Sequence, residues 1–175
     1  MMFNAKPLPH LQDEDHTLPD KRQRMLAFLE ATPVGVLSTV SPDNNPYGAV
    51  VYFSVTRDFI VSVLTKKETK KYDNLKHNDH VMLTVFEPLQ QTTVQITGVA
   101  EEITRNFEVN EIAEANLAAS LATSEAGIPA IMKLDAGEYA AFKIRPVEIR
   151  MAVFARPDSG EAKELFEIID NFPIK

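Results

Sequence analysis

The sequence predicts a mainly β fold, built from an antiparallel sheet with peripheral helices. Short apolar or alternating segments recur between residues 34 and 103, and turn signals such as SPDNNPY separate them. Most of the connections are too short for the crossover that joins parallel strands. An antiparallel sheet of this size usually curls and closes into a barrel, which removes its exposed edges. We therefore expect a barrel with helices outside it.

The N-terminal part predicts an arm followed by a helix. Residues 1–16 combine Pro, His and acidic residues without periodicity and are expected to form a flexible arm, with a single domain over 17–175. Thr17 and Asp20 resemble a capping box that starts the helix. Its apolar face consists of Met25, Leu26, Phe28 and Leu29.

The strands follow from apolar runs and period-two alternation bounded by turn residues. The expected strands are Gly35–Val40, Gly48–Val55, Phe59–Thr65, Val81–Phe86, Thr92–Ile103 and two segments within Glu138–Phe154 that are separated at Pro146.

Three further helices are expected among and after these strands. A short one covers Thr69–His77, a longer one covers Arg105 to about Ala122, and a last one covers about Glu161–Asn171. The second of these belongs to a helical insertion at about 104–138, which is the expected source of specificity because added helices and loops on a scaffold usually carry it.

Composition limits the classes of function. Eighteen Lys and Arg against 25 Asp and Glu give a formal charge of −7, which argues against a general binder of nucleic acid or of acidic membranes. The absence of cysteine excludes disulfides and thiolate metal sites. No apolar run is long enough to span a membrane, and the first residues lack a secretory signal, so we expect a cytoplasmic protein. The four histidines suit turns and the leader better than a metal site.

The most informative segment is LTKKETKKYDNL, residues 64–75, which places four lysines within six residues. Lys70 and Lys71 fall in the first turn of the expected helix, where the helix dipole opposes each cation by about 0.3–1 kcal/mol. A bound phosphate would reverse this effect and accept hydrogen bonds from Thr65 or Thr69. The alternative is a solvated charged turn that Glu68 partly neutralises. Spacing alone leaves both interpretations open.

Three stretches together resemble the pyridoxamine 5′-phosphate oxidase-like, FMN-binding split-barrel superfamily. They are VGVLSTVSPDNNPYGAVVYFSV, FIVSVLTKKETKKYDNLKHNDHVMLTVF and VQITGVAEEI, within about residues 33–103, and FKIRPVEIRMAVF matches more loosely. The resemblance implies a six-stranded antiparallel Greek-key split barrel that works as a homodimer, with a flavin at each end of the interface.

The resemblance also implies roles for particular residues. The residues that match positions holding the FMN phosphate are Thr65, Lys70 and Lys71, and Thr93 falls where the oxidase proper has a flavin-contacting glutamine. The residues that match the strand lying along the isoalloxazine ring are Ala49, Val50, Val51 and Tyr52. No catalytic side chain is assigned.

Departures from the oxidase proper point to a branch similar to general stress proteins. The oxidase carries an arginine where this chain has Ala49 and a substrate-contacting lysine where it has Ser54, and its Arg-x-His signature has no counterpart near Phe172. Vitamin B6 oxidation is therefore not expected. The hypothesis is an FMN-dependent oxidoreductase acting on an unknown small substrate. The alternatives are a non-catalytic flavin- or haem-binding stress-response module, and haem or a deazaflavin in the same groove.

Overall fold

A computed structural model describes residues 18–123, 137–154 and 166–172. The predicted arm at 1–16 and most of the 124–138 part of the insertion lie outside these residues. The elements are α1 (Leu18–Ala31), β1 (Val34–Val40), β2 (Pro46–Val55), β3 (Val61–Lys66), α2 (Lys70–His77), β4 (His80–Glu87), β5 (Thr92–Ile103), α3 (Asn106–Thr123), β6 (Tyr139–Val153) and β7 (Phe166–Ile169).

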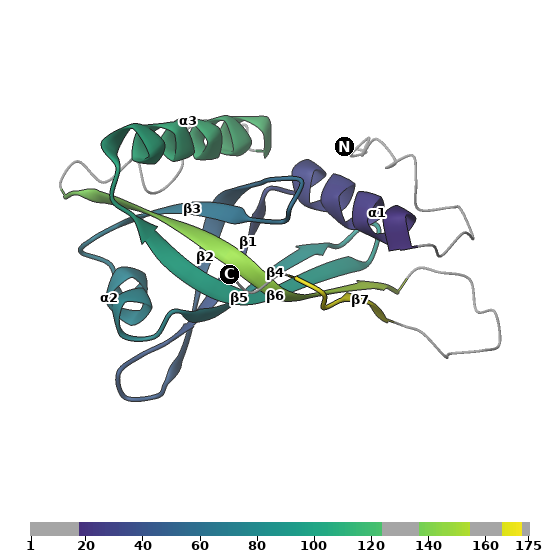
Figure 1. Cartoon of the computed structure of the whole chain (residues 1–175), viewed down its shortest axis with the longest axis horizontal. Helices are drawn as coiled ribbons and strands as arrows, with labels where there is room; N and C mark the ends of the chain where they lie inside the picture. The colour runs from purple at the N-terminus through teal and green to yellow at the C-terminus, as the bar shows by residue number, and fades with distance from the viewer. Residues whose placement is uncertain (1–17, 124–136, 155–165, 173–175) are drawn as a thin grey trace.

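Strands β1 to β6 form a closed antiparallel barrel, as predicted. Their order is β3-β2-β1-β4-β5-β6, and β3 also pairs with β6, which closes the ring. Strands β1, β2 and β3 follow one another, and β4 returns to lie beside β1, which is the Greek-key arrangement. The short helix α2 lies in that return connection, so it sits at one end of the barrel (Figure 1).

The predicted break at Pro146 is wrong, because β6 continues through it as one strand of 15 residues. The register between β5 and β6 shifts between Thr97 and Gly98, and Val147 has no partner on β5. This irregularity is a β-bulge, which interrupts the ladder of hydrogen bonds. A proline lacks an N–H and is tolerated at such a point. The bulge therefore explains how β6 accommodates Pro146.

The predicted C-terminal helix is wrong over the residues that the structure describes. Residues 161–165 of that prediction lie outside them, and Phe166–Ile169 form strand β7, which pairs with the end of β6. Glu167 is buried and its carboxylate accepts a hydrogen bond from Arg24 of α1 at 2.9 Å. This long-range ion pair favours the strand, because only an extended segment directs Glu167 toward α1 while it pairs with β6.

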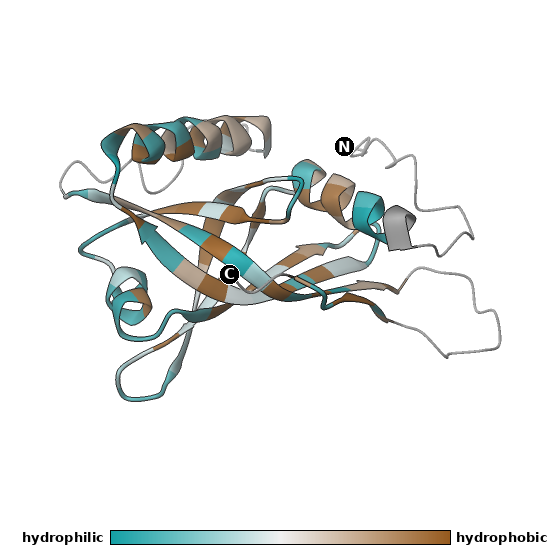
Figure 2. Cartoon of the chain, viewed as in Figure 1, coloured by the Kyte–Doolittle hydropathy of each residue, from teal (hydrophilic) through white to brown (hydrophobic). Residues whose placement is uncertain are grey.

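The barrel interior is filled by side chains from every strand and is closed by α1. Met25, Phe28 and Leu29 of α1 are fully buried, as predicted for its apolar face. Figure 2 shows the apolar residues along the strands, whereas α2 and the β1–β2 loop are mainly hydrophilic. Strand β3 begins at Val61, two residues later than predicted, because Phe59 adopts a positive φ of 61° that an extended strand does not allow.

Helix α3 packs on the outside of the barrel. Its Ile112 forms a second apolar cluster with Leu64 of β3 and Ala141 of β6. In Figure 1, α3 and α1 lie above the sheet toward opposite ends of the molecule. Among the described residues, no helix is both long and apolar enough to cross a membrane.

Candidate cofactor-binding site

Two threonine hydroxyls meet where β3 ends and α2 begins. Thr65 is buried at the end of β3, and its Oγ1 lies 3.0 Å from Oγ1 of Thr69. Thr69 is the N-cap of α2, where it accepts a hydrogen bond from the backbone N–H of Tyr72 and donates one to the carbonyl of Lys66 at 2.8 Å. These bonds hold the first turn of α2 against a barrel strand.

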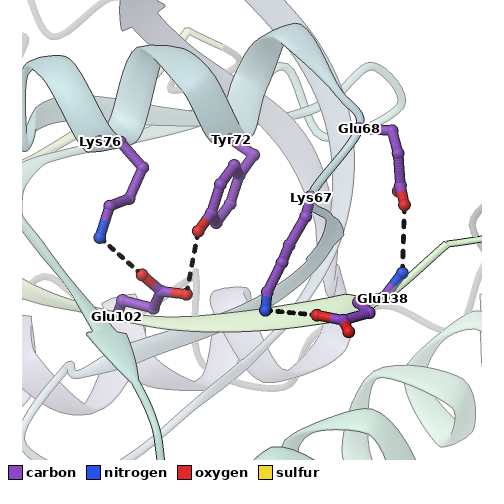
Figure 3. Close-up of polar contacts among 6 residues, drawn as sticks. All are labelled: Lys67, Glu68, Tyr72, Lys76, Glu102 and Glu138. Atoms are coloured by element: carbon purple, nitrogen blue, oxygen red, sulfur yellow. Dashed lines mark hydrogen bonds and ion pairs between the residues drawn. The ribbon is translucent and has the colours of Figure 1, made fainter.

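Part of the lysine cluster is already neutralised within the chain. Lys67 pairs with the carboxylate of Glu138 at 2.6 Å, and this contact raises the pKa of Lys67 (Figure 3). Glu68 accepts a hydrogen bond from the backbone N–H of Glu138 at 3.2 Å. Lys66 is buried, and its Nζ lies 5.3 Å from the centre of the Tyr139 ring. The solvated-turn interpretation therefore suits the exposed Lys67 and Lys70, whereas Lys66 is buried and Lys71 is half-buried.

Lys70 and Lys71 differ from these neighbours. Neither makes an ion pair with a carboxylate in the part of the chain that the structure describes. Lys70 Nζ lies 6.0 Å from the centre of the Tyr47 ring, at the start of β2. Lys71 is half-buried, and burial lowers its pKa because desolvation disfavours the charged form. Both lysines occupy the electropositive end of α2, so a bound anion would stabilise this corner.

Helix α2 is held against the barrel by side chains other than Lys70 and Lys71. Glu102 of β5 accepts hydrogen bonds from Lys76 at 2.8 Å and from the Tyr72 hydroxyl at 3.4 Å (Figure 3). The buried Asn74 donates a hydrogen bond to Thr39 of β1 at 2.9 Å, and Leu75 lies in the core. Helix α2 is therefore attached to two strands, which holds Lys70 and Lys71 in place.

The predicted ring-binding strand forms an open strip on the outer face of β2. Val51 points into the core, Val50 is 68% exposed, and Ala49 and Tyr52 are half-buried. A Cβ placed on the neighbouring Gly48 would lie 3.2 Å from Cγ1 of Val36 on β1, which is a tight contact, and would meet no other atom within 4 Å. Tyr47, whose ring centre lies 6.0 Å from Lys70 Nζ, precedes this strip on the same strand, but its side chain lies on the same face of β2 as that of Val51 and not as that of Val50. The backbone of β2 therefore runs from the α2 corner to the outer strip.

Thr93 is not brought to the same place within one chain. It lies half-buried on the outer face of β5, and β1 and β4 separate β5 from β2. Three strand spacings correspond to roughly 14 Å along the sheet. The structure thus brings together Thr65, Lys70, Lys71 and the start of the ring-binding strand, and it leaves Thr93 on another part of the same surface.

Sequence reasoning missed two residues of this corner. Tyr47 was assigned to a turn, although its position just before the ring-binding strand places it beside Lys70. Asn74 was not singled out, although it is a buried polar residue that positions α2. The only available signal for Asn74 was a polar residue next to Leu75 on the inward face of an amphipathic helix.

The last features to consider are candidate metal ligands and the pocket at the C-terminal end of α2. The described residues contain no group of three or more His, Asp or Glu residues that could hold a metal ion. His77 and His80 are exposed and lie at or beyond the far end of α2. A pocket of about 330 Å³ lies at that same end, and its lining residues are Leu75, Lys76, His77, Asp79, Ala100, Glu102 and Phe142.

By its fold, the chain is an antiparallel split barrel with a lysine-bearing helix at the end of β3. The sequence profile of the pyridoxamine 5′-phosphate oxidase family matches residues 22–152, and the chain belongs to this family. No curated protein sequence matches the chain significantly.

Solved structures share the fold. General Stress Protein 26 from Bacillus anthracis str. Sterne has a TM-score of 0.58 at 21% identity, over 75% of this chain and 92% of that protein. A heme binding protein from Mycobacterium smegmatis has a TM-score of 0.57 at 20% identity, over 85% of this chain but only 56% of that protein. An F420 reductase has a TM-score of 0.54 at 20% identity, over 69% of this chain and 91% of that one. At sequence identities of 20–21%, the similarity to these structures shows a shared fold and nothing about function.

Proposed function

We propose that this chain is an FMN-dependent oxidoreductase of the pyridoxamine 5′-phosphate oxidase-like type that acts on a small substrate. The observation that carries the proposal is the pair Lys70 and Lys71, which the described residues leave without a carboxylate at the electropositive end of α2. Family membership supports the same assignment. We also propose the cytoplasm as its location, in keeping with the expectation from the sequence.

The residues present fit the two ends of FMN. Lys70, Lys71 and Thr65 supply the ammonium and hydroxyl groups that suit a phosphate dianion. Residues 49–52 of β2 offer a backbone along which a flat ring can lie, with Val50 and Tyr52 on the outer face. When bound, FMN supplies a ring that exchanges hydride or electrons, while the protein orients it and excludes water. No residue of the chain is assigned a catalytic step.

We propose a homodimer as the functional form. Four large apolar residues are exposed on the neighbouring strands β2, β1 and β4: Val50, Val36, Met82 and Phe86. Val36 and Val50 are direct cross-strand partners, so part of this surface is continuous. A second copy would cover it. The same arrangement would let Thr93 of one copy reach the flavin held by the other, which a single chain does not allow.

The proposal is tested first by the absorption spectrum of the freshly isolated protein and by titration with FMN. We expect a yellow protein, or a colourless one that binds added FMN and quenches its emission. Anaerobic addition of NADH or NADPH should then bleach the bound flavin if the protein turns over with these donors. Bound flavin that neither donor reduces would favour the non-catalytic module, and a protein that binds no FMN would contradict the proposal.

FMN affinity is expected to fall as the pH rises from neutrality through the lowered pKa of Lys71. Burial lowers the pKa of Lys71 below its usual 10.5, so this lysine loses its proton at a lower pH than an exposed lysine and then no longer attracts the phosphate. The phosphate is already a dianion above pH 7, because its second pKa is about 6. Lys71→Gln should remove this part of the pH dependence, and an identical slope in both proteins would contradict the assignment.

The effect of Lys71 on the stability of the apoprotein has the opposite sign. Its pKa is lower in the folded than in the unfolded chain, so the charged lysine opposes folding at neutral pH. This opposition fades as the pH rises through the lowered pKa toward 10.5. FMN should therefore stabilise the protein against denaturant more at pH 7 than at high pH.

Haem and a deazaflavin remain second candidates for the same groove, because the fold is shared with a heme binding protein and an F420 reductase. Haem needs an axial ligand, and His77 lies about 10 Å along the helix axis from Lys70. A strong absorption band in the near-violet would identify haem. Chromatography of the released cofactor would separate a deazaflavin from FMN.

A further inference from the structure

The last residues before β6 are bound directly to the loop between β3 and α2. The backbone N–H of Lys67 donates a hydrogen bond to the carbonyl of Glu138 at 3.0 Å, and Lys67 Nζ donates one to the Glu138 carboxylate at 2.6 Å. In the other direction, the backbone N–H of Glu138 donates to the Glu68 carboxylate at 3.2 Å. Figure 3 shows the Glu68 side chain directed toward this N–H group. The end of the helical insertion therefore determines where the Glu68 carboxylate lies.

Gly137 provides the room that the Glu68 carboxylate occupies. It has a φ of 103°, a conformation that glycine adopts readily and other residues do not. A Cβ at this position would overlap with both carboxylate oxygens of Glu68. The three nearest atoms all belong to the end of that one flexible side chain, so Glu68 is the group that would move. An alanine in place of Gly137 would thus push the Glu68 carboxylate away from the N–H of Glu138.

The position of Glu68 matters because it is the only acidic residue among residues 66–71, which include four lysines. It directly precedes Thr69, the N-cap of α2, so it lies at the electropositive end of this helix. A carboxylate that is free to move there is attracted by the helix dipole and by Lys70 and Lys71, as a phosphate is. Among the ion pairs of the described residues, none joins Glu68 to either of these lysines.

We propose that Gly137 and the backbone N–H of Glu138 hold the Glu68 carboxylate away from Lys70 and Lys71, and so keep the phosphate site open. Gly137 is then a positioning residue, because it acts through Glu68 and not through contact with the flavin. This inference rests on the proposed FMN function. It gives the last residues of the insertion a role in selecting a phosphorylated ligand.

Gly137→Ala is expected to weaken FMN binding about fivefold, because the displaced Glu68 pairs with a lysine and this exposed pair must break before the phosphate binds. Riboflavin lacks the phosphate, so its affinity should not change. Adding Glu68→Gln to Gly137→Ala should restore most of the FMN affinity, because the displaced side chain is then neutral. The strain of an alanine at a φ of 103° remains in the double variant. Rescue therefore separates the charge of Glu68 from a general loss of structure.

Two substitutions at Glu68 test the inference without backbone strain, and they decide it even if Gly137→Ala does not fold. Glu68→Asp keeps the charge, but it is one methylene shorter and does not reach the N–H of Glu138. We expect it to weaken FMN binding about fivefold, like Gly137→Ala. Glu68→Gln removes the charge and keeps an oxygen that can accept the same hydrogen bond, so FMN should bind at least as tightly as to the wild type. Quenching of flavin emission measures all the affinities, and circular dichroism checks that the variants are folded.

The outcomes separate this inference from the proposed function. Equal FMN affinities of Glu68→Asp and Glu68→Gln would overturn the inference and leave the FMN assignment standing. The same holds for a folded Gly137→Ala that binds FMN as tightly as the wild type, that loses riboflavin affinity to the same extent, or that Glu68→Gln does not rescue. A wild-type protein that binds no FMN would overturn the assignment, and the inference with it.

Discussion

Lys71→Ala is expected to weaken FMN binding by about 10- to 100-fold, which corresponds to the loss of one hydrogen bond to a charged group. Lys71 sits in the first turn of α2 and is half-buried, so water replaces its contribution poorly. The purified variant should be colourless or much paler than the wild type. Titration of the apoprotein, followed by quenching of flavin emission, measures the change.

Lys67→Ala is the matched control for this variant. It removes the same charge from the same segment, but Lys67 already pairs with Glu138 at an exposed position. Exposed pairs of this kind contribute about 0–1 kcal/mol, so FMN affinity should change by no more than about fivefold. Equal losses in the two variants would show that general positive charge, rather than the α2 corner, attracts the flavin.

Glu167→Ala is expected to lower the free energy of unfolding by about 3–5 kcal/mol, because it leaves the charge of Arg24 buried without this carboxylate. Both side chains are almost inaccessible to water, at 6% for Arg24 and 1% for Glu167. Domains are typically stable by only 5–15 kcal/mol, so the loss is a large fraction of the total. Urea unfolding followed by circular dichroism measures it.

Glu101→Ala provides the comparison for the buried pair. Glu101 pairs with Arg145 at 3.1 Å on the surface, where both side chains are more than half exposed. Its removal should cost at most about 1 kcal/mol. If Glu167→Ala is no more destabilising than this variant, β7 is not anchored to α1 in the way that the structure shows.

The barrel could be predicted because its signals are local. The alternation of Thr92–Ile103 appears directly as alternating burial along β5. The short connections before β2 and β3 permitted only antiparallel neighbours, as observed. Both features depend on residues only a few positions apart, so they can be predicted from the sequence alone.

The errors arose where distant residues decide the local structure. The segment Glu161–Asn171 was expected to form a helix, and its residues 166–169 form strand β7 instead. The contact with Arg24, 143 residues away, makes Glu167 an inward residue of a strand. Pro146 likewise suggested a break because the bulge that accommodates it depends on the pairing of β6 with β5.

The candidate site likewise combines features that local spacing predicts with contacts that only the fold creates. Thr65, Lys70 and Lys71 lie within seven residues, so their meeting at one strand–helix junction followed from spacing. The contact of Lys70 with Tyr47 and the pairing of Lys67 with Glu138 depend on the strand order, which spacing does not give. The roles assigned to these residues, and to Thr93 and residues 49–52, remain predictions until a flavin is bound.

The most direct measurement compares the affinities of the wild-type apoprotein for FMN and for riboflavin, which differ only by the phosphate. If Lys70, Lys71 and Thr65 hold that phosphate, FMN should bind at least about 100-fold more tightly, and Lys71→Ala should remove much of the difference. Equal affinities for the two compounds would contradict the account, because the corner at the start of α2 would then hold no phosphate.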